Sequence, residues 1–431
     1  MVLLLILVLG LLLYAWIVYP AMLLWLGKQA SRQWAVGRGQ QEEGKMPHVA
    51  ILFSAHNEEG EILRRLENLA ALDYPADRVQ VFVGIDGGTD RSADIALAWA
   101  KSHPNVHVVV SPQNHGKTAM LKRLVVSVES RVESQQQVAA DVPAAAGRQG
   151  CECIRRDVEC HPEGKSFLVS LLVFTDANTF FAPDALRHLV SPFADSKVGG
   201  VCGRLIFLDE AGSETRENLY WRMETLLKTA ESRLDSCLGA NGAIYAIRPE
   251  LFWGEIPDST IIDDFVIGIK VREQGFRMVY EPQAMAFEQT PARIADEWRR
   301  RVRIGAGAFQ AMSLCHACLS PRYGRFALIF WSHKILRWFT PHLMLLLAAL
   351  ATANLFCGAG RGVVWALVIL SVGAGFVLLA AIGRLMGPLS RLKAFEYFLS
   401  MQTALFAGFL RYCRGGLRGH WERTERGRGH V

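Results

Sequence analysis

Charged side chains are missing from the first 27 residues of the chain, and Lys28 is the first one. An uncharged stretch of this length can cross a membrane, which takes ~20 apolar residues. A cleaved signal peptide is disfavoured, because no basic residue precedes the apolar run, the run is too long and no A-x-A site follows. The next basic residues, Arg32, Arg38 and Lys45, place the following segment in the cytoplasm by the positive-inside rule. We therefore expect an N-terminal transmembrane anchor at residues 1–27.

Several other patterns are also absent. The sequence has no internal repeat and no heptad array, so neither a repeat protein nor a coiled coil is expected. Gly116-Lys117-Thr118 resembles a phosphate loop, but residue 111 is Ser where the Walker pattern requires Gly, and a P-loop is rejected. The net charge of +6 is spread over the juxtamembrane segments and the tail. This distribution indicates contact with membrane lipids and no nucleic-acid partner.

Paired C-x-x-C arms, the usual sign of a zinc site, are missing as well. The nine cysteines lie in a compartment that we expect to be reducing, so free thiols are expected. Cys151, Cys153, Cys160 and His161 form a cluster that could bind zinc, but a loop of reduced thiols is favoured.

Hydrophobic residues make up 51% of the chain, and the excess lies at its two ends. The segments 338–357 and 362–383 are long enough to span a membrane, and the basic residues that flank them predict a hairpin with both ends in the cytoplasm. Residues 395–410 are apolar but short, with basic residues on both sides. A re-entrant or interfacial helix is favoured there, and a true span stays open.

These features predict the membrane-proximal parts of the chain. Residues 291–337 should form amphipathic interfacial helices, because the first part of this segment is basic and amphipathic. Residues 338–411 should form the C-terminal transmembrane or re-entrant helices, and residues 412–431 a basic cytoplasmic tail. We expect an integral membrane protein whose central domain, between these ends, lies in the cytoplasm.

Between the ends, apolar strands alternate with helical patterns, which is typical of an α/β fold with a mostly parallel sheet and crossover helices. This domain should cover residues 48–290, after a polar linker at 29–47, with a surface insertion at 129–165. The predicted strands are 49–54, 79–85, 106–110, 167–175, 198–208, 276–280 and 284–287. The predicted helices begin near residues 62, 92, 117, 213 and 263.

One predicted strand ends in a candidate metal site. Residues 167–175 read as a buried strand, and Asp176 and Asn178 follow it directly. Ligand sites of open α/β sheets lie at the carboxyl ends of the strands. Two side-chain oxygens spaced two residues apart can turn toward one hard cation. We expect Asp176 and Asn178 to hold Mg²⁺ or Mn²⁺ against a diphosphate.

Other polar residues leave strands at the same predicted edge. Asp86 ends the second strand and can accept hydrogen bonds from a ribose or a base, although turn formation with the following glycines is the alternative. Asn57 and Glu58 leave the first strand and could hold a nucleoside, or could simply cap the next helix. Lys117 could reach a phosphate as a point charge, or could be a solvated helix start.

Two charged pairs on predicted helices complete the candidate site. Asp263 and Asp264 begin a helix, where acids can act as a cap or as a general base. Neighbouring helical residues point about 100° apart, so only one should face the pocket, and we expect Asp264 to be that residue. Arg300 and Arg303 share a helix face and could clamp a diphosphate, with binding of anionic lipid as the alternative.

These residues, in this order, resemble the membrane-embedded family-two glycosyltransferases, the group of the poly-N-acetylglucosamine, chitin, hyaluronan and cellulose synthases. The resemblance covers about residues 48–425 without the insertion. The matching motifs are Ala55-His56-Asn57-Glu58-Glu59, Asp86-Gly87-Gly88-Thr89-Asp90, Phe174-Thr175-Asp176-Ala177-Asn178, Asp263-Asp264 and Arg300-Arg301-Val302-Arg303-Ile304. They look like the family's nucleotide motif, uridine-binding loop, D-x-D metal motif, E-D pair and Q-x-x-R-W motif, in that order.

The resemblance implies a GT-A fold, inversion at the anomeric carbon, a UDP-sugar donor and a polysaccharide or glycolipid acceptor. It also implies that Asp264 is the catalytic base and that Asp263, Asn57, Glu58, Asp86, Lys117, Arg300 and Arg303 contact substrate. Three departures matter: Asn178 replaces an acid, Asp263 replaces Glu, and Arg300 and Ile304 replace the Gln and the Trp. The missing Trp favours single-sugar transfer to a lipid-linked acceptor as an alternative. A non-catalytic nucleotide-binding subunit is a second alternative.

Overall fold

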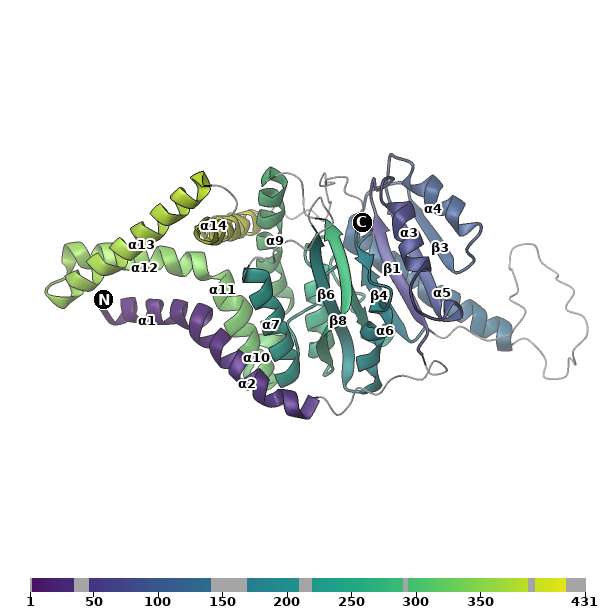
Figure 1. Cartoon of the computed structure of the whole chain (residues 1–431), viewed down its shortest axis with the longest axis horizontal. Helices are drawn as coiled ribbons and strands as arrows, with labels where there is room; N and C mark the ends of the chain where they lie inside the picture. Colours follow the sequence, from purple (N-terminus) through teal and green to yellow (C-terminus); the bar gives the residue numbers. More distant parts are fainter. Residues whose placement is uncertain are drawn as a thin grey trace, which may run out of the picture.

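A computed structural model of the chain describes residues 2–34, 46–140, 169–208, 219–289, 294–386 and 392–415. A β-sheet with helices on both faces forms one half of the molecule, and long apolar helices project from its other half (Figure 1). The Cys151–His161 cluster lies outside the described residues, whereas the six cysteines within them are all free thiols.

Eight strands of the described residues form a single sheet in the order β3-β2-β1-β4-β7-β6-β8-β5. β1 pairs in parallel with β2 and β4, and β7 runs antiparallel to both β4 and β6. The predicted α/β fold is therefore confirmed, with a mixed sheet. The strand bounds are β1 Val49–Ala55, β2 Val79–Asp86, β3 Val106–Ser111, β4 Leu171–Thr175, β5 Phe180–Phe181, β6 Val198–Leu208, β7 Ile244–Ile247 and β8 Arg277–Gln289.

Alternation along the strands divides the core between the two faces of the sheet. In β1, Ala50 and Leu52 belong to one buried cluster, and Val49, Ile51 and Phe53 belong to the other. Helices α5 (Lys117–Ala140) and α8 (Asp263–Glu273) pack on the first face, and α3 (Ile62–Ala70), α4 (Ser92–Ala100) and α6 (Ala185–Val190) pack on the second. Both faces are covered, as the unbroken apolar runs of these strands require.

The structure corrects two predicted boundaries. The expected edge strands 276–280 and 284–287 are one strand, β8, which lies between β6 and β5. Its register jumps at Pro282, because Gly203 pairs with Glu281 while Arg204 pairs with Met285. Such a bulge accommodates a proline, which has no N–H for the ladder. The insertion was predicted to begin at residue 129, but helix α5 continues to Ala140. The first residues of the predicted insertion are therefore helical.

The helical half is built from both ends of the chain. The N-terminal helix runs through α1 (Val2–Leu13), the π-helical turn η1 (Tyr14–Val18) and α2 (Tyr19–Trp34), so helix replaces the first part of the predicted linker. The later elements are α7 Leu219–Leu234, α9 Ile294–Leu314, η7 His316–Leu319, η8 Pro321–Tyr323, α10 Arg325–Phe330, the π-helical turn η9 Trp331–Ile335, α11 Leu336–Trp338, α12 Thr340–Cys357, α13 Arg361–Leu385 and α14 Lys393–Cys413.

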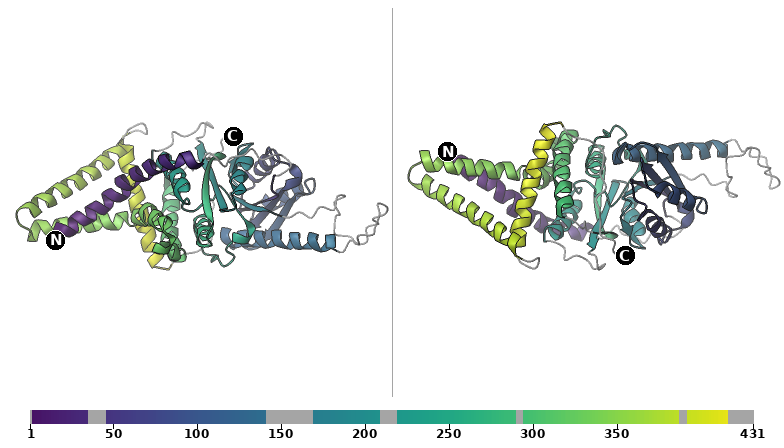
Figure 2. Two further views of the ribbon diagram at one scale, coloured as in Figure 1. Left: turned by 90° about the horizontal axis from the view of Figure 1, so that it is seen from below. Right: turned by 90° about the horizontal axis from the view of Figure 1, so that it is seen from above.

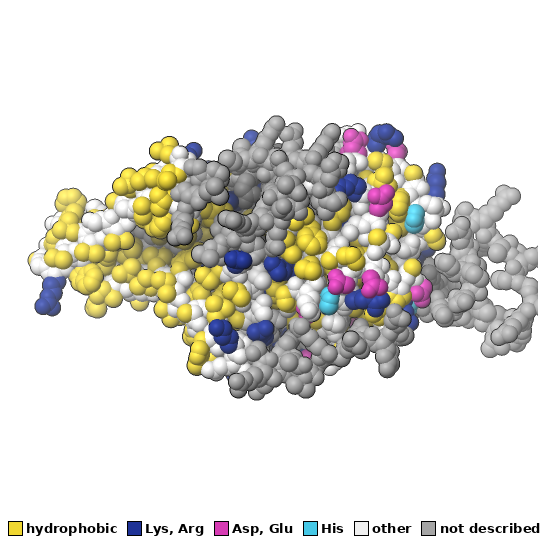
Figure 3. All heavy atoms as spheres, viewed as in Figure 1, with side chains coloured by type: hydrophobic (Ala, Val, Ile, Leu, Met, Phe, Trp, Pro, Cys, Tyr) yellow, Lys and Arg dark blue, Asp and Glu magenta, His cyan; other side chains and the backbone are white. Residues whose placement is uncertain are grey.

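Three of the described helices are long and apolar enough to cross a membrane, namely Val2–Ala30, Thr340–Cys357 and Arg361–Leu385. Hydrophobic side chains cover the part of the surface where α1, α12 and α13 project, and charged side chains gather over the sheet (Figure 3). This arrangement indicates a membrane-associated protein, while the anchor and the hairpin topology stay predictions. α14 does not belong to this set.

Helix α14 instead lies against α9 (Figure 2). Their backbones touch at two glycines, where a Cβ built on Gly408 would lie 2.8 Å from Gly305 Cα. A Cβ built on Gly305 would lie 3.2 Å from Leu405 Cα. The absence of side chains at both positions therefore permits a close helix crossing, which sets the position of α9 beside the sheet.

Candidate active site

The polar rim is the edge of the sheet where Asp176 and Gly242 lie. It forms at the point where β7 runs antiparallel to β4. Asp176 directly follows β4, and its neighbour Thr175 pairs with Ile244, the first residue of β7. Because β7 runs antiparallel to β4, the loop that enters β7 lies beside the residues that leave β4. Gly242 is therefore next to Asp176, although 65 residues separate them in the chain.

Three charged side chains converge on Gly242. A Cβ built on this glycine would lie 3.1 Å from Lys117 Nζ, 3.3 Å from Asp176 Oδ2 and 3.5 Å from Asp264 Oδ2. Lys117 Nζ donates a hydrogen bond to Asp176 Oδ1 at 2.6 Å. Residues from the start of α5, the end of β4 and the start of α8 thus share one small space, and an added methyl group at Gly242 would fill part of it.

Asp263 and Asp264, at the start of α8, have raised pKa values. Asp263 is buried, with 3% of its surface exposed, and part of the Asp264 side chain remains accessible. Burial raises the pKa of Asp263 to about 6, although Lys117 opposes the shift. Burial also raises the pKa of Asp264, again opposed by Lys117. A carboxylate with a raised pKa and an accessible face is suited to accept a proton near neutral pH.

Helix α9 adds two arginines and fixes the segment before α8. Burial and the neighbouring Arg300 lower the pKa of Arg303, while Asp263, Asp176 and Asp264 raise it, so Arg303 faces the acidic group. On the same helix, Gln310 accepts a hydrogen bond from Ile261 N at 3.0 Å. The start of α8 is therefore held against the helix that carries the arginines.

Asp86 lies beneath the site and supports it. Its side chain is fully buried and accepts hydrogen bonds from His115 N at 3.0 Å and Gly116 N at 2.7 Å. A carboxylate at this position satisfies the amides at the N-terminus of α5, which begins at Lys117. Asp86 therefore helps to position Lys117, a contact that the sequence alone did not suggest.

Asn57 and Glu58 occupy the neighbouring part of the rim, at the end of β1. Asn57 has a φ of 56°, in the left-handed region that asparagine tolerates, and its Oδ1 accepts a hydrogen bond from Thr89 N at 2.8 Å. The backbone N–H of Glu58 donates to Ser92 Oγ at 2.9 Å. These contacts join the loops after β1 and β2, and they do not bring either residue into the group around Gly242.

The side-chain oxygens near Gly242 suit a hard cation, such as Mg²⁺, that also binds oxygen atoms of the substrate. Among the described residues, no three His, Cys, Asp or Glu side chains are placed to hold a metal by themselves. Mg²⁺ and similar ions commonly use one or two carboxylates together with substrate phosphates. Asp176 can supply a carboxylate oxygen, and Asn178, two residues further along the chain, can supply its amide oxygen. A diphosphate would supply the remaining oxygens.

The part of the chain that carries these residues matches a known protein family. Residues 47–307 match the family described as "Glycosyltransferase like family 2", which is more than half of the chain. The chain belongs to this family. The match covers the sheet, all of the charged residues described above and the first half of α9.

Individual family-2 relatives are distant. The "Probable glycosyltransferase YdaM" of Bacillus subtilis (strain 168) is 24% identical over 61% of this chain and 56% of the relative. The "Poly-beta-1,6-N-acetyl-D-glucosamine synthase" of Staphylococcus aureus (strain MSSA476) is 20% identical over 61% of this chain and 55% of that protein. The alignments thus span about half the length of these curated relatives.

A solved structure extends the likeness to nearly the whole family-2 chain. A mannosyltransferase from Pyrobaculum calidifontis, in complex with GDP-Man and Mn²⁺, matches with a TM-score of 0.63. The alignment covers 94% of this chain and 97% of that one at 20% identity. At this identity the likeness establishes the fold, which is GT-A-like, as the sequence resemblance implied.

Sequence reasoning missed two residues that shape the site of this family-2 chain. Gly242 was not among the predicted site residues, because a glycine carries no side chain that suggests chemistry. Arg65 was not recognised, yet it is fully buried, donates to Thr175 Oγ1 at 2.9 Å and lies 4.4 Å from the centroid of the Phe181 ring. Its signal was an arginine at the apolar i+3 position of a helix that begins at Ile62.

Proposed function

We propose that this protein is an inverting glycosyltransferase that moves a sugar from a nucleoside-diphosphate sugar to a hydroxyl group of a polysaccharide or glycolipid. UDP is the nucleotide that we expect. The observation that carries the proposal is the convergence of Lys117, Asp176 and Asp264 on Gly242, at the polar rim of a GT-A-like sheet. Two carboxylates and an ammonium group close to one another are groups that transfer from a diphosphate requires.

Five residues are proposed to stabilise the leaving group, two of them through a metal ion. Asp176, with Asn178 and the phosphate oxygens of the donor, would hold Mg²⁺ or Mn²⁺, which supplies positive charge to the departing diphosphate. Arg303 faces the same acidic group from α9, and its guanidinium can bind phosphate oxygens in a bidentate manner. Lys117 adds a point charge beside Asp176, close to Gly242. Arg300, beside Arg303, would extend this positive surface.

Asp264 is proposed as the general base. Its accessible carboxylate would take the proton of the acceptor hydroxyl while that oxygen attacks the anomeric carbon from the face opposite the diphosphate. The result is inversion at that carbon. Asp263, which is more deeply buried, would keep the start of α8 in place and raise the negative charge around Lys117. Asn57, Glu58 and Asp86 are proposed to seat the nucleoside at the neighbouring part of the rim.

The membrane-proximal helices are proposed to deliver the acceptor. The chain would place its sheet in the cytoplasm, with residues 1–27 as an anchor and residues 338–411 around the acceptor path in a bacterial inner membrane. Ile304, at the position of the Trp of the polymer synthases, is 39% exposed. An aliphatic side chain there offers no ring on which a growing glycan can stack, so transfer of a single sugar to a lipid-linked acceptor is the second candidate.

The decisive experiment uses detergent-solubilised full-length protein with a panel of UDP- and GDP-sugars, Mn²⁺ or Mg²⁺ and membrane lipids. Mass analysis of the products separates polymer from single-sugar transfer. Asp264→Asn should lower turnover by about 10³-fold or more while leaving nucleotide binding nearly unchanged, because only proton removal is lost. Asp184→Asn is the matched control, because Asp184 is exposed and its side chain pairs with His188 alone in the part of the chain that the structure describes. Full turnover by Asp264→Asn would exclude the proposed base.

A further inference from the structure

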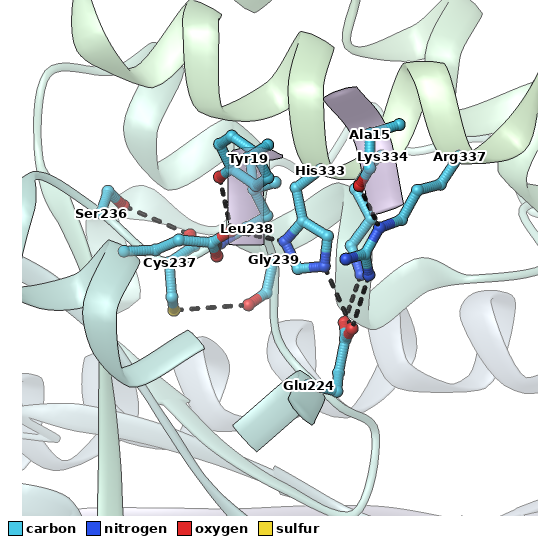
Figure 4. Close-up of polar contacts among 11 residues, drawn as sticks. Ala15, Tyr19, Glu224, Ser236, Cys237, Leu238, Gly239, His333, Lys334 and Arg337 are labelled. Carbon is cyan, nitrogen blue, oxygen red and sulfur yellow. Dashed lines mark hydrogen bonds and ion pairs between the residues drawn. The ribbon is translucent and has the colours of Figure 1, made fainter. Parts of the chain in front are cut away.

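A cluster of buried charged side chains lies outside the candidate active site, where α7 meets the N-terminal helix and the segment 331–338 (Figure 4). Glu231 and His333 are fully buried, and Glu224 is 7% exposed. Charged groups are costly to bury, and they persist when partners and hydrogen bonds compensate them. The proposed transfer reaction uses none of these residues, so the cluster needs a separate explanation.

Hydrogen bonding within the cluster requires an additional proton. His333 Nε2 lies 3.0 Å from Glu224 Oε2, and His333 Nδ1 contacts Glu231 Oε1. Ionised carboxylates only accept hydrogen bonds, so these contacts require either an imidazolium at His333 or a protonated glutamate. Lys334 and Arg337 pair with Glu224, which leaves Glu231 as the principal partner of the imidazole. The imidazole and its two carboxylate partners thus share one proton more than a neutral histidine and two ionised glutamates would hold.

Two π-helical turns from distant parts of the chain meet at this cluster. One turn is Tyr14–Val18 in the N-terminal helix, and the other is Trp331–Ile335, which precedes α12. The hydroxyl groups of Tyr14 and Ser332 share a hydrogen bond of 2.9 Å. A π-helical turn changes the direction of side chains relative to an ordinary helix, and such turns often occur at functional positions. Here the second turn directs His333 and Lys334 at α7, and Tyr19, which directly follows the first turn, reaches Glu231 on the same helix.

Glu231 connects this junction to the candidate active site. Its Oε1 accepts a hydrogen bond from Tyr19 Oη at 3.3 Å. Its Oε2 accepts a hydrogen bond from Leu238 N at 3.4 Å. Leu238 opens the loop that leads to Gly242, the glycine on which the charged residues of the site converge. One carboxylate therefore contacts both the N-terminal helix and the loop beneath the reacting groups.

The loop has little freedom to absorb a shift at Leu238. Gly239 has a φ of 68°, and a Cβ built on it would lie 2.5 Å from the Phe265 ring. The Asn241 side chain donates to Gly203 O at 2.8 Å and accepts from Ile244 N at 3.2 Å. A segment held by contacts at both positions passes a displacement from one end to the other, because those contacts limit how far its backbone can move.

We propose that Glu231 and His333 are positioning residues, which hold the Leu238–Gly242 loop in register with Lys117, Asp176 and Asp264 when the N-terminal helix is docked on α7. This inference rests on the proposed function for its kinetic consequence. Packing of the membrane-proximal helices then becomes a requirement for turnover, although no residue of the cluster touches substrate.

The first test is Glu231→Gln in the full-length protein. Glutamine has the same shape but only one accepting oxygen, so it cannot accept from both Leu238 N and the junction. We expect hydrogen exchange in the peptide that covers residues 235–243 to rise about tenfold, which is the effect of losing one hydrogen bond. With the active sugar donor, kcat should fall by about tenfold or more, while the dissociation constant of the free nucleotide stays within about twofold.

A matched pair of hydroxyl deletions tests the link to the N-terminal helix. Tyr19→Phe removes the bond to Glu231, and Tyr412→Phe removes a 2.7 Å bond to Ser313 between α14 and α9. Each variant loses one oxygen atom and one bond between helices. Tyr19→Phe should increase exchange in the 235–243 peptide and lower kcat, whereas Tyr412→Phe should leave both unchanged.

The outcomes separate this inference from the proposed function. Unchanged loop exchange in both Glu231→Gln and Tyr19→Phe, or an equal effect of Tyr412→Phe, would overturn the positioning role. Exchange that rises across the whole sheet would also overturn it, because general destabilisation would then be the cause. If the wild-type protein transfers no sugar, the proposed function fails, but the exchange measurements still test the structural link.

Discussion

Lys117 is the residue whose replacement tests the electrostatics of the site most directly. Its ammonium pairs with Asp176 at 2.6 Å, and both side chains are mostly buried, with 21% and 25% exposed. Although burial opposes it, Asp176, Asp263 and Asp264 raise the pKa of Lys117, so its charge is retained at every practical pH. Lys117→Met therefore removes a permanent positive charge from among three acids and keeps the length of the side chain.

The expected magnitude follows from the burial of this pair. Removing one partner of a buried pair costs about 3–5 kcal/mol, and the partial exposure favours the lower end, about 3 kcal/mol at neutral pH. The loss of folding free energy depends on pH, and Asp263 sets the sign of this dependence. The pKa of Asp263 rises from 3.8 to about 6 in the folded protein. A carboxyl group with a raised pKa binds its proton more tightly when folded, so stability falls as the pH rises from about 4 to about 6.

In Lys117→Met the folded-state pKa values of Asp263 and Asp264 should rise further, because Lys117 lowers both. The destabilisation should therefore be small near pH 4 and reach its full size only above the raised pKa. In chelator-treated protein, unfolding midpoints between pH 4 and pH 8 should show a deficit that grows to roughly 6 °C or more.

Lys122→Met, on the same helix, is the control. Lys122 pairs with Asp258, whose side chain is 60% exposed, so its loss should cost less than about 1 kcal/mol with little pH dependence. A Lys117→Met deficit that is independent of pH, or that is largest at pH 4, would refute the electrostatic reasoning.

Three further predictions concern packing and metal. Gly242→Ala places a methyl group 3.1 Å from Lys117 Nζ, so kcat should fall about tenfold or more in steady-state assays without a large change in unfolding midpoint. Arg65→Met leaves the buried Thr175 hydroxyl without its donor and removes the contact with Phe181. The free energy of unfolding in denaturant should therefore fall by about 2–4 kcal/mol. An unfolding midpoint within error of wild type would contradict this role. Chelation with EDTA should abolish transfer, and added Mn²⁺ or Mg²⁺ should restore it, whereas transfer that persists in EDTA would exclude a metal.

Local patterns were sufficient to predict most strands and helices of the sheet domain. Strands β1 to β3 and helix α8 begin within a residue of the predicted positions, because their apolar runs and flanking glycines are local signals. The mixed direction of the sheet was not predictable in this way. The direction of β7 relative to β4 depends on contacts between residues far apart in the chain, and no local signal records them.

The candidate site was also predictable only in part, because its residues could be selected from the sequence but their arrangement could not. Asp176, Asp264 and Lys117 could be selected as chemically suitable residues, but their meeting point at Gly242 comes from the reversal between β4 and β7. Asp86 was selected for a nucleoside contact, and the buried carboxylate also supports the amides before α5. The roles of these residues in substrate binding stay predictions. The internal pairing of Glu231 with His333 had no sequence signal, because 102 residues separate them.

The glycine contact between α9 and α14 has a consequence for how the protein senses its lipid surroundings. Two helices that touch through Gly305 and Gly408 must tilt together, because sliding one along the other would press side chains into the opposing backbone. α14 follows the apolar hairpin of α12 and α13, and α9 carries Arg303. We therefore expect bilayer thickness, through the tilt of that hairpin, to alter the depth at which the arginine meets an arriving acceptor.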